Sequence, residues 1–365
     1  MKFLRQISFL PFLAAFWLLV GLASTSKAMN ASYLYNLSNF SGPLPYQWAI
    51  LFVDQGTNEI YVIDRERGGV TVFNDAGMEI YHFGDGNEFG SIADGAVDSS
   101  GNILLLSKGH IVRCDYRGEP VDKIAFKEFP PEYPSFSPGR FVVRDNRFYL
   151  ADMMAMRIVV TDNAGLFLKG YDIASLLRDQ GMKDKDTDSE KMDMFGFSVD
   201  RDGNLLCTIP GLSSALRITP DGKATVFGRR GSGPGKFGVV SGIVSDDRGY
   251  YFVSDRLRCV VLVFDNDLKF HGEFGYRGVG KANLVAPNDL AVDREGRLYI
   301  AQAARRGVSV FRIDGAGGRP ASNRPKGGDQ PKDTENGFAQ GSDMGRTLPA
   351  RAGGANRPPT KVNPS

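Results

Sequence analysis

The feature that most constrains the fold is a sequence unit that recurs six times at a nearly constant spacing. In each unit a short apolar segment ends in an aspartate, and successive aspartates are 44, 47, 55, 46 and 47 residues apart. These aspartates are Asp54, Asp98, Asp145, Asp200, Asp246 and Asp293. A period in this range is typical of β-propeller blades and similar arrays. Because one such unit is too small to bury both of its faces, the units are expected to pack against each other.

Each unit repeats the same order of strands and turns. After the aspartate, apolar and polar residues alternate, as in residues 58–62 (NEIYV) and 296–300 (GRLYI), and such alternation predicts a strand. A third strand ends in a turn with Gly or Asn, as in residues 74–77 (NDAG). A fourth strand ends in Phe-Gly in several units, for example at Phe227-Gly228 and Phe274-Gly275. Four strands in each of six units predict an all-β fold, a six-bladed β-propeller.

The sixth unit has no fourth strand of its own, because its pattern stops at Ile313. The segment Ser32 to Leu37 (SYLYNL) reads as a strand that stands before the first unit. We therefore predict that this N-terminal strand pairs with the last blade and closes the ring. Such closure removes two exposed sheet edges at once.

The two ends of the chain differ from the repeats. Residues 1–28 combine basic Lys2 and Arg5, an apolar run at 7–23 and the small-residue site Ser26-Lys27-Ala28, which predicts a cleaved export signal. An uncleaved anchor is the alternative, and contact with a membrane is expected only through this segment, if at all. The propeller is expected over residues 29–313 and a disordered Gly/Pro/Arg-rich tail over 314–365. These features predict a periplasmic or extracellular protein.

The strand pattern resembles the NHL-repeat family over roughly residues 45–313. The resemblance is carried by a strand ending in Val-Asp, then Gly-x-Leu-Tyr, then an aspartate such as Asp64, Asp152 or Asp255, then a later Phe-Gly. It implies a six-bladed propeller, and this fold serves scaffolds, ligand binders and hydrolases alike.

Channel-facing residues provide the first candidate site. When the six first strands are aligned, Asp94 and Asp289 fall at equivalent positions, Asn288 precedes the latter, and Arg140 lies close to the matching place. Converging oxygen ligands at a narrow axis can hold Ca²⁺, so Asp94, Asn288 and Asp289 are candidate metal ligands. The alternative is a solvated channel mouth that binds no ion.

Basic residues in the loops between second and third strands provide the second candidate site. Together with Arg140, the candidate partner-binding residues are Arg65, Arg67, His110, Arg256, Arg258, Arg305 and Arg306. A ring would gather most of them on one face and attract an acidic partner. In the alternative interpretation, several of these arginines pair with the loop aspartates, as Arg258 would with Asp255.

These observations favour a monomeric, exported binding scaffold over an enzyme. The expected partner is a protein or an acidic polymer of the cell envelope, and nucleic acid is not expected because the formal net charge is only +2 and an export signal is predicted. The alternative function is a Ca²⁺-dependent lactonase or esterase acting in the channel. A zinc enzyme is disfavoured because His82 and His271 are placed on outer fourth strands, away from His110.

Overall fold

The structure is a computed structural model that describes residues 30–39, 42–44, 46–65, 68–86, 88–181 and 192–314. The predicted export signal and the predicted tail beyond Asp314 lie outside these ranges, as do residues 182–191. Within the described ranges, no helix has the length and apolar character needed to cross a bilayer.

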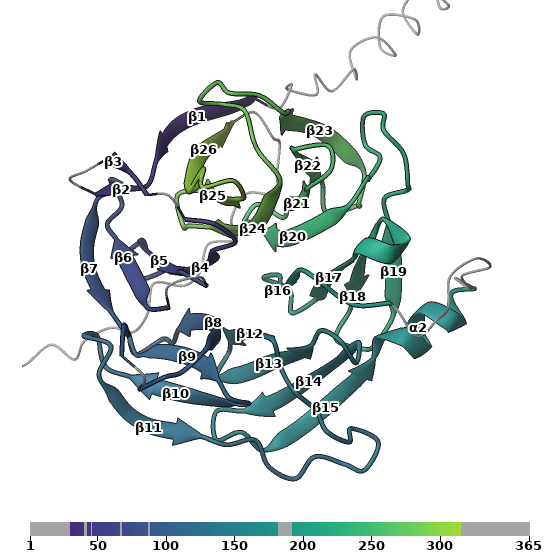
Figure 1. The fold of residues 1–365 in the computed structure, drawn as a ribbon. Coiled ribbons are helices and arrows are strands. Elements are labelled where there is room, and N and C mark those ends of the chain that lie inside the picture. Colours follow the sequence, from purple (N-terminus) through teal and green to yellow (C-terminus); the bar gives the residue numbers. More distant parts are fainter. Residues whose placement is uncertain are drawn as a thin grey trace, which may run out of the picture. The chain divides into compact units, whose positions relative to one another are not determined.

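The part of the chain that the structure describes forms a ring of six four-stranded antiparallel sheets, as predicted (Figure 1). The first three blades are β4 (Ile50–Asp54), β5 (Glu59–Ile63), β6 (Val70–Phe73) and β7 (Glu79–Phe83); β8 (Ile92–Val97), β9 (Ile103–Ser107), β10 (His110–Cys114) and β11 (Pro120–Ile124); and β12 (Arg140–Arg144), β13 (Arg147–Asp152), β14 (Arg157–Asp162) and β15 (Phe167–Asp172). The next two are β16 (Phe197–Val199), β17 (Leu205–Ile209), β18 (Ser214–Ile218) and β19 (Ala224–Phe227); and β20 (Val240–Ser245), β21 (Tyr251–Asp255), β22 (Val260–Phe264) and β23 (Phe270–Gly275). The sixth contains β24 (Pro287–Val292), β25 (Arg297–Gln302) and β26 (Val308–Asp314).

The N-terminal strand completes the sixth blade, which confirms the predicted ring closure. Strand β1 (Asn30–Asn36) pairs antiparallel with β26, placing Ala31 opposite Ile313 and Tyr33 opposite Phe311. The rings of Tyr33 and Phe311 meet edge to face with centroids 5.8 Å apart. The two ends of the propeller are thus joined by one sheet (Figure 1).

The recurring aspartate has a structural role in the turn between first and second strands. The Oδ1 atom of Asp98 accepts hydrogen bonds from the backbone amides of Ser100 (2.8 Å) and Asn102 (2.9 Å), and Asp200 makes the equivalent pair of bonds. Asp145 differs because it and Asn146 both have positive φ, at 49° and 58°. This two-residue hairpin turn needs no carboxylate acceptor.

The Phe-Gly pair at the end of fourth strands packs one blade against the linker to the next. Gly228 has a φ of +80°, and a Cβ atom there would clash with the ring of Phe237 in the linker. Gly275 has a φ of +111° and faces Leu284 in the same way. The motif therefore combines a backbone conformation that favours glycine with a close contact that requires it.

Several smaller elements lie outside the six sheets. Helix α2 (Ile173–Asp179) directly follows β15, and the side chain of Asp172 caps it by accepting from the Ser175 amide at 2.8 Å. A small hairpin, β2 (Ser38–Asn39) and β3 (Gly42–Pro43), and a 3₁₀ turn, η2 (Pro210–Leu212), complete the described elements. The three cysteines, Cys114, Cys207 and Cys259, are buried and free.

Candidate functional site

The first strands of the blades surround the channel, and the loops lie at its two ends. Strands β4, β8, β12, β16, β20 and β24 each contact their neighbours around the ring (Figure 1). Because the strands of a blade alternate in direction, the loops between second and third strands share one face with the linkers between blades. We term this the loop face. The opposite face carries the turns between first and second strands and is termed the turn face.

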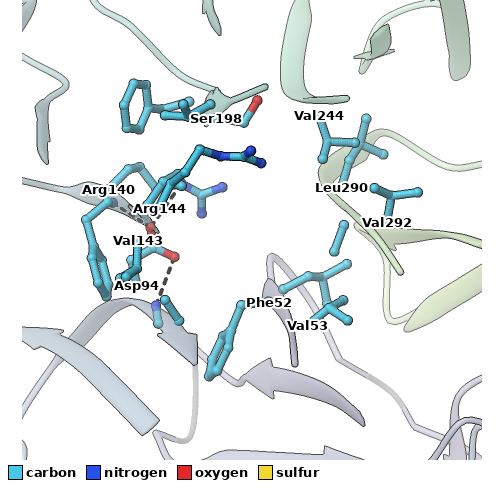
Figure 2. A pocket seen from close by; sticks show the side chains of 18 of the residues that line it. Phe52, Val53, Asp94, Arg140, Val143, Arg144, Ser198, Val244, Leu290 and Val292 are labelled. Atoms are coloured by element: carbon cyan, nitrogen blue, oxygen red, sulfur yellow. Dashed lines mark hydrogen bonds and ion pairs between the residues drawn. The ribbon is translucent and has the colours of Figure 1, made fainter. Parts of the chain in front are cut away.

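Three charged residues from three blades meet inside the channel. Arg140 begins β12 of the third blade, and its Nη2 donates to Oδ1 of Asp289 in the sixth blade at 2.5 Å. Its Nε lies 3.7 Å from Oδ2 of Asp94 in the second blade. Since the third and sixth blades are opposite each other in the ring, the Arg140 side chain crosses the channel. Figure 2 shows Arg140 beside Asp94.

Both carboxylates of this triad also hold the next blade in place. Oδ2 of Asp94 accepts a hydrogen bond from the Phe141 amide, and Oδ2 of Asp289 accepts one from the Leu51 amide, each at 2.9 Å. The three side chains are between 4% and 13% exposed. The triad therefore connects four of the described blades through buried, charge-assisted bonds.

The pKa values of Asp94 and Arg140 are shifted within the triad. Burial raises the pKa of Asp94 from 3.8 to about 6, against the opposing effects of the Arg140 guanidinium and the Phe141 amide. Burial also acts to lower the pKa of Arg140, but the carboxylates of Asp289 and Asp94 outweigh it and raise that pKa. Arg140 is consequently a fixed cation between two acidic groups.

The Ca²⁺ site predicted at Asp94, Asn288 and Asp289 falls at this triad and stays a prediction. The Asn288 side chain is 3% exposed, and its Oδ1 has no hydrogen-bond partner among the described residues. Within those residues, no group of three or more His, Cys, Asp or Glu side chains is arranged to hold a metal ion. The donor set fits Ca²⁺ poorly, since Arg140 already neutralises the carboxylates that the ion would need.

A second group of side chains from different blades covers the loop-face end of the channel. The guanidinium of Arg256, in the fifth blade, lies 4.4 Å from the ring centroid of Trp48 and 5.0 Å from that of Phe195. Trp48 and Phe195 precede the first strands of the first and fourth blades, which are opposite each other. We term these three residues the aromatic lid. Sequence reasoning placed Arg256 on a partner surface and missed both aromatic residues, although each stands two positions before a first strand.

Two of the predicted partner-binding arginines instead hold loops in place. The expected pairing of Arg258 with Asp255 was wrong: Arg258 pairs with Glu273 through Nη2 at 2.5 Å and Nη1 at 2.9 Å. The Asp255 carboxylate is used by backbone amides, including that of Gly238 at 2.6 Å. Arg306 donates from Nη2 to the Gly280 carbonyl at 3.0 Å, so it fixes the linker before the sixth blade.

The other predicted residues of the basic face differ in exposure. Arg65 and Arg305 are exposed and form no ion pair with another described residue. His110 is half-buried, and its Nδ1 lies 3.4 Å from the Lys108 carbonyl oxygen. Arg67 lies outside the described residues.

Positive charge on the loop face is concentrated at the fifth and sixth blades. Four loop segments there, residues 229–239, 256–259, 276–286 and 303–307, contain nine Lys or Arg residues and no Asp or Glu. We term them the basic sector. They also carry exposed apolar side chains: Leu257 is 70% exposed, Tyr276 53% and Val279 96%. Cations beside exposed apolar groups are typical of surfaces that bind other macromolecules.

Comparisons with known proteins support the fold. No protein-family profile matches the sequence, and no curated protein matches it either. A protein of unknown function from Bacteroides thetaiotaomicron has a similar structure, with a TM-score of 0.58 and 15% identity over 79% of this chain and 76% of that one. A gluconolactonase from Xanthomonas campestris is similar with a TM-score of 0.52 and 13% identity over 80% of this chain and 93% of that one. At such identities the likeness establishes the propeller fold alone.

Proposed function

We propose that this chain is an exported propeller of the NHL-repeat type that binds a protein or an acidic polymer of the cell envelope on its loop face. The observation that carries the proposal is the basic sector, where nine cations lie in four neighbouring segments without a carboxylate. A surface of one charge sign steers an oppositely charged partner and fixes its register.

The contacts inside the channel support binding at the surface over metal-dependent hydrolysis in the channel. At the loop face the aromatic lid joins opposite blades, and deeper in the channel Arg140 joins Asp289 across it. The lactonase alternative requires carboxylates that are available to a metal ion and a substrate. Because Asp94 and Asp289 are engaged by Arg140 and by backbone amides, that alternative is not proposed.

Within this proposal, some basic residues contact the partner directly, and others hold the loops in position. Arg305, Arg277 and Lys281 are exposed and available to an acidic ligand, whereas Arg258 and Arg306 hold the linkers that present them. Leu257, which is exposed, supplies apolar contact area within the sector. Export to the periplasm or beyond, through the signal predicted at residues 1–28, would place this surface in contact with envelope components.

Site-specific photocrosslinking tests the proposal. A photoreactive phenylalanine analogue is introduced at Leu257 on the loop face and, as a matched control, at Tyr116 on the turn face, since the two side chains are 70% and 71% exposed. Irradiation of an envelope fraction should yield a discrete adduct from position 257 that excess unlabelled protein removes. Equal adducts from both positions, or none from position 257, would contradict the proposal.

A further inference from the structure

A cavity of about 240 Å³ occupies the turn-face half of the channel, on the side of the triad away from the basic sector. Its lining includes Val53, Val142 and Val292, which lie late in their first strands, toward the turn face. Asp94 and Arg140 line its inner end. This volume is far larger than the roughly 10–15 Å³ that one water molecule requires. The cavity is therefore a pocket of small-molecule size at the end of the channel that the loop face does not use.

The walls of the pocket combine polar atoms with a group of aliphatic side chains. Val53, Val142, Val244, Leu290 and Val292 contribute aliphatic side chains from four of the described blades. Figure 2 shows Val244, Leu290 and Val292 together on one side of the open space. This aliphatic part of the wall favours a ligand that also has a hydrocarbon body, since burial of apolar area contributes to affinity in such pockets.

Two polar side chains face that wall without partners. Arg144 ends β12 and is half-buried, and its side chain forms no ion pair or hydrogen bond with another described residue. The Ser198 hydroxyl oxygen is buried and likewise has no hydrogen-bond partner in the described part of the chain. Figure 2 shows both side chains directed into the open space. A partly buried charge and a buried hydroxyl that lack partners are unfavourable, and a bound anion would satisfy both.

Of the two arginines that line the pocket, Arg144 is the one whose charge is available to a ligand. Arg140 also lines the pocket, but Asp289 and Asp94 balance its charge. The guanidinium of Arg144 is planar and suited to a bidentate pair with a carboxylate. Its place in the last residue of β12 puts it at the turn-face end of the pocket, away from the acidic groups of the triad.

We propose that this pocket binds a small organic carboxylate with an apolar body. The carboxylate pairs with Arg144 and accepts from Ser198, and the hydrocarbon part lies against Val244, Leu290 and Val292. This assignment is independent of the loop-face function, because the two sites lie on opposite sides of the triad.

Calorimetric titration of the mature protein tests the proposal. The probes are benzoate, phenylacetate and 4-methylpentanoate, with benzamide and acetate as controls that remove the charge or the apolar body. At least one of the three acids should bind with a Kd below about 1 mM, and benzamide and acetate about tenfold or more weakly. Failure of all three acids to bind would overturn the proposal, as would binding of acetate with equal affinity.

Substitutions assign any binding to the pocket. Arg144→Gln should weaken binding of the acid about tenfold or more, and Val244→Phe should weaken it by filling the pocket. Arg147→Gln is the matched control, because Arg147 pairs with Arg144 in the β12–β13 ladder but is exposed and lies outside the pocket. Binding that survives both pocket substitutions, or that Arg147→Gln weakens as much as Arg144→Gln, would place the acid elsewhere and overturn the assignment. Circular dichroism confirms that each variant is folded.

Discussion

Replacing Arg140 by methionine should destabilise the propeller strongly. Among the described residues, Arg140 is the only cation within 4 Å of the Asp94 and Asp289 carboxylates, and all three side chains are almost fully buried. Removing one partner of a buried ion pair leaves an uncompensated charge and costs about 3–5 kcal/mol. Here two carboxylates lose their counterion at once, so we expect a loss of unfolding free energy toward the upper end of that range.

A double-mutant cycle separates the ion pair from other effects of the substitution. Asp289→Asn keeps an oxygen that can accept from the Leu51 amide and removes the charge that Arg140 neutralises. If the pair interacts as the 2.5 Å contact indicates, Asp289→Asn should cost less in the Arg140→Met background than in the parent. Chemical denaturation of the four proteins measures the coupling energy, which we expect to exceed about 1 kcal/mol. A coupling within about 0.5 kcal/mol of zero would refute the reasoning, because independent sites show that much deviation.

The pH dependence of the same cycle gives a further check. The pKa of Asp94 is about 6 in the folded protein and 3.8 ordinarily, so between these values the folded state holds a proton that the unfolded state has lost. The contribution of Asp94 to the unfolding free energy is therefore complete below about pH 4. It decreases by up to about 3 kcal/mol as the pH rises to about 6. Asp94→Asn should remove this decrease. Arg140→Met should enlarge it, because the guanidinium holds down the pKa of Asp94.

Three further predictions concern the lid, the blade linkers and the metal. Arg256→Met should lower the unfolding free energy by about 1–2 kcal/mol through loss of the two aromatic contacts, whereas Arg305→Met, which is exposed, should change it by less than about 0.5 kcal/mol in the same denaturation assay. Gly228→Ala should lower the melting temperature, since alanine would have a strained positive φ and a clash with Phe237; an unchanged value would contradict the packing described. Calorimetry with Ca²⁺ should show stronger binding to Arg140→Met than to the parent, and tight binding to the parent that Asp289→Asn abolishes would instead restore the predicted metal site.

The blade architecture could be predicted from the sequence because it depends on local and repeated patterns. The period of the aspartates, the alternation within strands and the unpaired segment at residues 32–37 each follow from the chain alone. The structure adds their physical causes: Asp98 caps a turn through two backbone amides, and Gly228 allows close contact with Phe237. Such local contacts can recur from blade to blade because each depends on residues within one repeat or its linker.

The site was harder to predict because its contacts join residues from different blades. Alignment of the first strands placed Asp94, Arg140 and Asp289 at one level of the channel. It did not predict that the Arg140 side chain would extend across the channel to Asp289. The aromatic lid depends on the direction of two side chains from opposite blades, which the sequence pattern does not encode. Arg258 was expected to pair with Asp255 because the resemblance to the repeat family implies pairs between loop arginines and loop aspartates. Backbone amides occupy that carboxylate, and Glu273 on the neighbouring β23 strand is the partner.

The most direct test of the account is equilibrium binding of an acidic polymer to the loop face. Fluorescence anisotropy with labelled poly-glutamate compares the parent protein with Arg277→Glu/Arg305→Glu, which reverses two exposed cations of the basic sector. Arg147→Glu, alone and combined with Arg144→Glu, reverses charge at the turn face as the control. We predict salt-sensitive binding that the loop-face variant loses and both turn-face variants retain. Equal loss in the loop-face and turn-face variants, or undiminished binding to Arg277→Glu/Arg305→Glu, would contradict the proposed binding surface.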